Sequence, residues 1–278
     1  MEEITKKIQD EARKLLTEGR VRAVVGYRRG WSSEVATPCF VTTEGGTDRL
    51  LYDASCRHNL AKYLVGREGL FKFAPTEEEE NLPVAIVARP ETQRTLVAMI
   101  KEKRFVRSDL IVLAINDGSQ AGLEPDMEVG RIEADNKGRE ELQAKIEALD
   151  AMEPSERWEF WKEELSKCIR CYACRQVCPF CYCERCIADE NQPQWIKKAP
   201  TTLSNVSWNI VRAYHLTGRC TECGECERAC PMDIPLSLLN TKLAMSVEDA
   251  FGYRAGIDAE ALPPMFEFRE DDNDEFIL

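Results

Sequence analysis

The sequence predicts an α/β domain with a partly parallel sheet, followed by an α-rich domain that is dense in cysteine. Two continuous apolar runs, residues 82–88 and 109–115, flank a helical pattern at 91–104. This order is typical of a βαβ unit in a sheet buried on both faces. Farther along, eleven of the 13 cysteines fall between Cys168 and Cys230. The 278 residues leave room for both domains.

Local patterns predict the other elements of the first domain. We expect an amphipathic helix at 3–18, strands at 21–27, 38–43 and 49–53, a turn at 45–46 and a helix at 58–66 that ends at Gly66. The stretch 117–138 is polar and rich in glycine and aspartate, so it predicts a loop.

Helices are the main elements predicted for the second half of the chain. They are expected at 139–150, at 153–168 with a capping box at Ser155, and at 201–218. The expected domains are an α/β domain at 1–150 that acts as a docking platform, a cysteine-rich domain at 151–256 and an acidic tail at 257–278.

Composition narrows the functional classes. The chain has 37 Lys and Arg against 49 Asp and Glu, a net charge of -12, which argues against a nucleic-acid partner. No apolar run reaches the roughly 18 residues that a membrane span requires. The first 16 residues lack the apolar region of a signal peptide, so we expect a cytoplasmic protein.

The cysteines predict metal or redox chemistry rather than disulfides, because an intracellular chain of this length seldom uses a disulfide framework. With only two histidines, His58 and His215, any metal must be held mainly by sulfur. General acid–base catalysis has few candidates, and neither a G-x-G-x-x-G loop nor a P-loop is present. The chain alone is therefore not expected to catalyse bond-making chemistry.

Two cysteine runs share the spacing C-x2-C-x2-C-x3-C followed by proline, which is the bacterial ferredoxin pattern for [4Fe–4S] clusters. The first contains Cys168, Cys171, Cys174 and Cys178, and the second contains Cys220, Cys223, Cys226 and Cys230. Zinc sites also use C-x2-C pairs, but they seldom use this spacing twice with a trailing proline. Two [4Fe–4S] clusters are expected.

In two-cluster proteins with this pattern, the fourth cysteine of each run binds the other cluster. The predicted ligand sets are therefore crossed: Cys168, Cys171, Cys174 and Cys230 for one cluster, and Cys220, Cys223, Cys226 and Cys178 for the other.

Three further cysteines, Cys181, Cys183 and Cys186, directly follow the first run. They are interpreted as inert buried thiols, as part of a third iron–sulfur centre, or as part of a structural zinc site. A third metal site would need a fourth ligand. Cys56 is the candidate, with Cys39 and His58 in reserve.

"CIRCYACRQVCPFCYCERC", together with "PQWI", "GRCTECGECERACPMDIPL" and "RHNLAKYL", resembles a known group. It is similar to iron–sulfur proteins related to the beta subunits of deazaflavin-linked hydrogenases and formate dehydrogenases of anaerobes. The resemblance extends over most of the chain, about 20–250, and is specific over 168–235. It implies a dicluster ferredoxin-like [4Fe–4S] domain, and partners among heterodisulfide-reductase-like, formate dehydrogenase, hydrogenase or flavoprotein subunits.

The sequence departs from these relatives in the first domain. Where many of them carry "KGCDxR" and "GVPCxG", this chain reads "ARPETQR" at 88–94 and "AINDGSQ" at 114–120. Flavin binding is therefore not carried over. The expected function is an electron-transfer subunit of an anaerobic redox complex. The alternatives are a flavin-containing oxidoreductase subunit that reduces a deazaflavin or similar carrier, and a structural adaptor.

Overall fold

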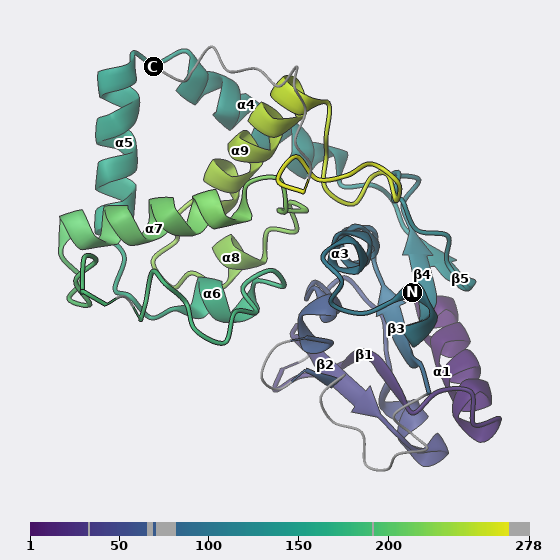
Figure 1. Ribbon diagram of the computed structural model, residues 1–278. Helices are drawn as coiled ribbons and strands as arrows, with labels where there is room; N and C mark the ends of the chain where they lie inside the picture. Colours follow the sequence, from purple (N-terminus) through teal and green to yellow (C-terminus); the bar gives the residue numbers. More distant parts are fainter. Residues whose placement is uncertain (33, 66–68, 71–81, 191, 267–278) are drawn as a thin grey trace.

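The computed structural model describes residues 1–32, 34–65, 69–70, 82–190 and 192–266. An α/β body and a largely helical body lie side by side, and helix α3 of the first faces the second (Figure 1). Gly66, the expected end of one helix, and most of the expected acidic tail lie outside the described residues.

A five-stranded mixed sheet forms the centre of the α/β body, in the order β2-β1-β3-β4-β5. The strands are β1 (Ala23–Arg29), β2 (Ala36–Val41), β3 (Val84–Ala88), β4 (Leu110–Asn116) and β5 (Met127–Arg131). Strand β2 pairs antiparallel with β1, and the other pairs are parallel. The prediction of an α/β region with a partly parallel sheet is confirmed.

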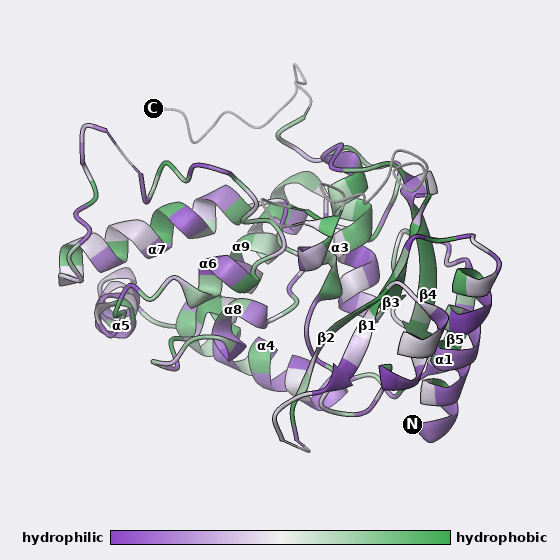
Figure 2. Cartoon of the chain, turned by 90° about the horizontal axis from the view of Figure 1, so that it is seen from below, coloured by the Kyte–Doolittle hydropathy of each residue, from purple (hydrophilic) through white to green (hydrophobic). Residues whose placement is uncertain are grey.

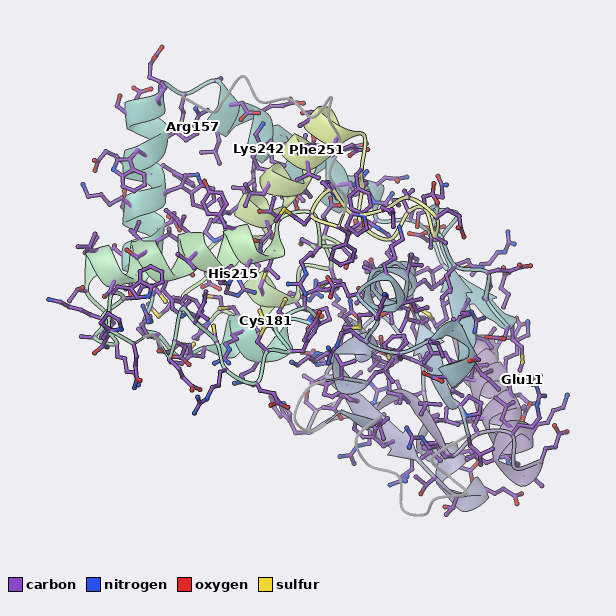
Figure 3. All side chains as sticks on the ribbon, viewed as in Figure 1. Glu11, Arg157, Cys181, His215, Lys242 and Phe251 are labelled. Carbon is purple, nitrogen blue, oxygen red and sulfur yellow. The ribbon has the colours of Figure 1, made fainter. Side chains whose placement is uncertain are left out.

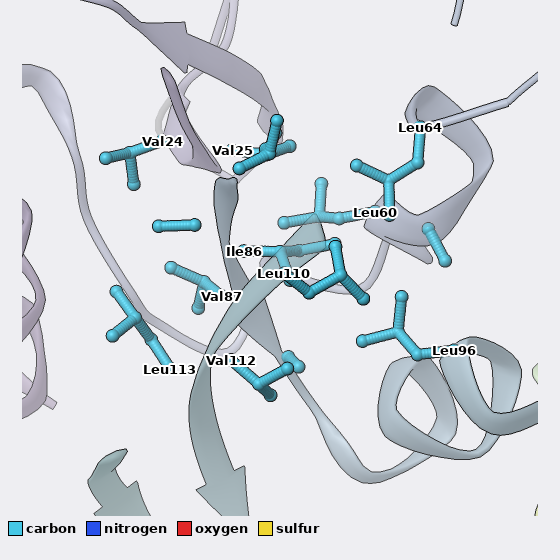
Figure 4. Packing of buried hydrophobic residues seen from close by; sticks show 14 of the residues in the cluster. Val24, Val25, Leu60, Leu64, Ile86, Val87, Leu96, Leu110, Val112 and Leu113 are labelled. Atoms are coloured by element: carbon cyan, nitrogen blue, oxygen red, sulfur yellow. The ribbon is translucent and has the colours of Figure 1, made fainter. Parts of the chain in front are cut away.

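Buried side chains explain why the central strands are apolar on both faces. Every residue of β3 is buried, as are the first six of β4. Their side chains interlock with Leu60, Leu64 and Leu96 in one core (Figure 4). Burying one such aliphatic side chain contributes about 1.5–3 kcal/mol, so these strands anchor the body.

Two helices cover opposite faces of the sheet (Figure 1). Helix α1 (Glu2–Thr17) buries Ile4 and Ile8 and contacts β5. Helix α3 (Pro90–Lys101) begins directly after β3, with Pro90 in its first turn, and contacts β3 and β4. Both helices were expected from the apolar periodicity. In the hydropathy view, apolar and hydrophilic residues are interleaved along both helices (Figure 2).

Three predictions for this body were wrong. Strand β5 lies within 117–138, where a loop was expected. The expected strand at 49–53 is mostly irregular: the 3-10 helix η1 (Glu44–Arg49) precedes it, and only Leu51 forms an isolated bridge to Tyr27. In place of the helix expected at 58–66, the described part has the short 3-10 helix η2 (Leu60–Tyr63).

Helices dominate the described part of the chain after β5. They are α4 (Asn136–Asp150), α5 (Pro154–Ser166), α6 (Ala173–Val177), α7 (Thr202–Leu216), α8 (Glu225–Arg228) and α9 (Leu236–Phe251). The start of α5 differs from expectation, because the Glu156 carboxylate, rather than Ser155, caps it by accepting from the Glu153 N–H at 3.2 Å. No helix among the described residues is long and apolar enough to cross a membrane.

Helix α4 packs with the helical body rather than with the sheet. Its buried Ile146 and Leu149 meet Leu238 of α9, with Trp161 of α5 beside them. Helix α7 contacts both α5 and α9 and runs above the short helices α6 and α8 (Figure 1). The two short helices contact each other, which brings the two cysteine runs together.

Candidate iron–sulfur centres

The two cysteine runs fold into the same local structure. In each, the residues two and four positions after the first cysteine have positive φ: Arg170 (58°) and Tyr172 (61°) in the first run, Glu222 (58°) and Gly224 (72°) in the second. A short helix then begins in each run, α6 or α8. Left-handed residues alternating with right-handed ones turn successive N–H groups inward, which makes a concave anion site.

The backbone donates to sulfur at equivalent places. The Arg170 N–H donates to Cys168 Sγ at 3.4 Å, and the Glu222 N–H donates to Cys220 Sγ at 3.4 Å. In the second run, the Asn240 side-chain amide also lies 3.5 Å from Cys226 Sγ. Such N–H···S contacts stabilise thiolates and tune cluster potentials.

One small cavity is lined by the cysteines predicted for the second cluster. Its walls include Cys178, Cys220, Cys223 and Cys226. Cys178 belongs to the first run, so this cavity joins a thiol of one run to three thiols of the other. Burial raises the pKa of both Cys220 and Cys223, and the negative charge of the nearby Cys178 raises both further.

Three cysteines predicted for the first cluster pack beside α7. Cys174 is buried with Trp208 of α7 and with Cys226 of the second run, and the partly buried Cys168 and Cys230 pack against this group. Burial raises the pKa of Cys174 to about 11, and the charges of Cys226, Cys168 and Cys230 add to that rise. Cys171 is exposed. The side-chain view shows the sulfurs concentrated below α7 (Figure 3).

The donor set fits a sulfur-bound cofactor. Buried thiols crowded together resist ionisation until a cation binds them, and metal binding is what releases their protons. Within the described residues, Arg170 Nε, Trp208 Nε1 and Arg212 Nε are buried without a hydrogen-bond acceptor. A buried N–H without an acceptor costs about 1–3 kcal/mol, and cluster sulfides are acceptors that would remove this cost.

Helix α3 braces the second run against the sheet. Asn59 Nδ2 donates to Thr95 Oγ1 at 2.8 Å, and this hydroxyl lies 2.8 Å from Thr221 Oγ1 in a buried chain. Glu222 accepts from Arg94 Nη2 at 3.0 Å and from Arg254 Nη2 at 3.0 Å. Burial raises the pKa of Glu222, but these two arginines outweigh burial and hold the pKa below its ordinary value.

A second brace connects the end of α3 with the residues after the first run. The Glu102 carboxylate accepts from Arg219 Nε at 2.5 Å and also bonds the Tyr182 hydroxyl. The Arg104 guanidinium lies 4.4 Å from the centre of the Tyr182 ring. The backbone between the two runs is therefore tied to the α/β body.

The remaining thiols are divided between two places. Cys181, Cys183 and Cys186 line a cavity of about 300 Å³ together with His215 of α7. Cys56 instead lies in the α/β core, where the Asp53 N–H donates to its Sγ at 3.4 Å. Its burial raises its pKa to about 12. Among the described residues, no three His, Cys, Asp or Glu side chains converge on one metal-ion position.

The two reserve ligands do not line the cavity of the three thiols. Cys39 is buried on β2, next to β1. His58 Nδ1 lies 3.4 Å from the carboxylate of Glu225, the first residue of α8. Sequence reasoning missed His215, because it follows the thiols by about 30 residues along the chain and carries no ligand spacing with them.

A large cavity lies where the parallel strands end. It measures about 690 Å³ and is lined by residues after β3 and β5, the 52–59 segment and two residues of the second run, Cys223 and Arg228. Open α/β sheets usually bind ligands at the carboxyl ends of their strands. A thiol predicted to hold the second cluster therefore faces this cavity.

Comparison with known proteins agrees with this geometry. Residues 164–234 match the family model of the 4Fe-4S dicluster domain. This part of the chain is thus similar to domains that bind two [4Fe–4S] clusters.

Two curated relatives share part of the chain. The F420-dependent formate dehydrogenase subunit beta of Methanocaldococcus jannaschii is 37% identical over 108 residues, which are 39% of this chain and 28% of that protein. The F420-dependent formate dehydrogenase 1 subunit beta of Methanococcus maripaludis is 31% identical over 107 residues, 38% of this chain and 27% of that protein. The match spans less than a third of either relative. Over that part, it confirms the resemblance seen in the sequence.

Proposed function

We propose that this protein is an electron-transfer subunit of a multi-subunit redox complex of the formate dehydrogenase, hydrogenase or heterodisulfide-reductase type, with a flavoprotein among its partner subunits. The dicluster domain and the two formate dehydrogenase relatives support this proposal. Bound [4Fe–4S] clusters supply one-electron carriers. The protein supplies the thiolates, the N–H···S contacts and a dry enclosure.

The observation that carries the proposal is the cavity that Cys178 shares with the second cysteine run. It favours the crossed sets: Cys168, Cys171, Cys174 and Cys230 for the first cluster, and Cys220, Cys223, Cys226 and Cys178 for the second. Crossed sets keep the clusters close to each other because α6 and α8 are in contact. Two adjacent clusters act more naturally as a path for electrons than as two folding staples.

The ends of this path are defined by exposure. Cys223 lines the 690 Å³ cavity at the sheet edge, whereas Cys171 of the first run is exposed. Electrons would enter at one of these ends and leave at the other. The exposed end suits contact with a partner subunit.

A third metal site is proposed at Cys181, Cys183 and Cys186. His215 lines the same cavity, so it replaces Cys56 as the favoured fourth ligand. Three cysteines and one histidine make a closed zinc set, and a small iron–sulfur centre could use the same atoms. Either metal would fasten the segment after the first run to α7.

Iron, zinc and sulfide should be quantified in anaerobically purified protein, with EPR of the reduced form. Two clusters give about eight irons per chain. One additional zinc makes the third site a clamp, and about four additional irons make it a third cluster. Fewer than about six irons would contradict the two-cluster proposal. Cys39→Ala is the control variant. It removes a buried thiol on β2 that belongs to neither predicted cluster set, so the iron content should stay unchanged.

One observation favours a second candidate function, a flavin-containing oxidoreductase subunit. The 690 Å³ cavity is large enough for a cofactor and reaches Cys223, and Arg57 and Arg89 on its wall could hold phosphate groups. The test is the visible spectrum of the purified protein, followed by chromatography of any cofactor released on denaturation. Flavin at one equivalent per chain would support this candidate, and its absence after flavin reconstitution would exclude it.

A further inference from the structure

Arg212 of α7 is a buried cation at the meeting point of the two cysteine sets. Only 5% of the residue is exposed. Its Nη2 donates to the Cys174 carbonyl at 3.0 Å, so it holds the loop of the first run. The same side chain lines the cavity of Cys178, Cys220, Cys223 and Cys226.

The charge partners of Arg212 distinguish it from Arg175 and Arg219. Burial lowers the pKa of Arg212, but the negative charges of Cys178, Cys181, Cys174 and Cys226 raise it above its ordinary value. By contrast, Arg175 pairs with Asp189 at 2.9 Å and Arg219 pairs with Glu102 at 2.5 Å. Arg212 Nε has no acceptor within the described residues.

We propose that Arg212 is a shared tuning residue that raises the reduction potentials of both clusters. This inference rests on the proposed pair of [4Fe–4S] clusters. An electron that arrives at either site adds one negative charge there. A fixed positive charge in a buried, weakly screened position stabilises that added charge more than a solvated one could.

The position of Arg212 places one positive charge near both sites. Because it contacts the loop of Cys174 and lines the cavity of the second set, its charge stabilises an added electron at either site. The two potentials should therefore move together when the charge is removed. A residue that served a single site would move only one of them.

The alternative is that Arg212 acts only as a brace through the Cys174 carbonyl. Two variants separate the roles. Arg212→Gln removes the charge and keeps hydrogen-bonding capacity, while Arg212→Lys keeps the charge and loses the guanidinium fork. Arg175→Gln is the matched control, because it removes an arginine near the cysteines whose charge is already paired with Asp189.

The measurement is an EPR-monitored redox titration of the whole purified chain, with iron content determined on each sample. In Arg212→Gln, the equilibrium constant for reduction should fall at least about tenfold at both sites, a downward shift of about 59 mV for a one-electron couple. Arg212→Lys should recover most of that shift, and Arg175→Gln should stay close to wild type.

Each outcome is decisive. Full iron with unchanged potentials in Arg212→Gln would overturn the inference, and a shift at one site only would overturn the shared role. If Arg212→Gln loses iron, the lysine variant decides: full iron with near wild-type potentials supports the charge role, whereas iron loss in both variants indicates a brace. Too little iron in the wild type would instead refute the two-cluster function itself.

Discussion

The two candidate cluster sites have the same backbone turns but different surroundings. The second site is enclosed by α3, because Thr221 and Glu222 bond to Thr95 and Arg94 in the α/β body. The first site lies among α5, α6 and α7, and its Cys171 is exposed. Identical spacing therefore produces one site braced by a second body and one site open to the surface. The spacing selects the cofactor, and the tertiary contacts decide what can reach it.

The largest expected effect comes from removing one thiolate from each site. Cys226→Ser and Cys171→Ser should each lose one cluster, about four of about eight irons. Cys226 is buried and Cys171 is exposed, so the Tm of Cys226→Ser should be lower by at least about 4 °C, which corresponds to roughly 1–2 kcal/mol. Iron analysis and calorimetry check this. Equal Tm values would mean that enclosure contributes nothing to the second site.

A smaller effect is expected where the α/β body meets the second site. Thr95→Val should lower the free energy of unfolding by about 1–3 kcal/mol, because Asn59 and Thr221 would each lose a buried hydrogen-bond partner. Denaturant unfolding followed by fluorescence measures it. Thr42→Val, at an exposed position, is the control. The brace would be refuted if the two variants were equally stable.

The smallest effect is expected at the surface of the helical body. Lys242 of α9 pairs with Asp150 of α4 at 2.7 Å, and both side chains are 42% exposed. Exposed pairs contribute about 0–1 kcal/mol, so Lys242→Ala should change the free energy of unfolding by less than about 1 kcal/mol. The same denaturant experiment checks it. A larger loss would show that the contact between α4 and α9 depends on this surface pair.

The sequence predicted those elements whose own residues carry a clear apolar pattern. Residues 82–115 alternate apolar strands with an amphipathic helix, so their βαβ arrangement was predicted correctly. Strand β5 was missed because "MEVGR" is short, half polar and interrupted by Gly130. Its strand state depends on pairing with β4 and on contact between Gly130 and Ile4 of α1, neither of which is local.

The candidate site also has a part with local sequence signals and a part that depends on tertiary contacts. The cysteine spacing is local, so it predicts the two runs and their identical turns. Arg212 and His215 lie on α7, between the two runs, and no spacing rule connects them to the thiols. A signal was nevertheless present: Asn205, Asn209 and Arg212 fall on the buried face of an amphipathic helix. Polar residues on such a face predict a buried polar partner, here the cysteine loops.

The crossed pairing of the cysteine runs is the central claim, and serine variants of the two fourth cysteines test it most directly. EPR of the reduced protein should show Cys178→Ser losing the same cluster signal as Cys223→Ser, and Cys230→Ser losing the same signal as Cys174→Ser. If Cys178→Ser instead matches Cys174→Ser, each run holds its own cluster, and the crossed sets together with the shared cavity at Cys178 would be contradicted.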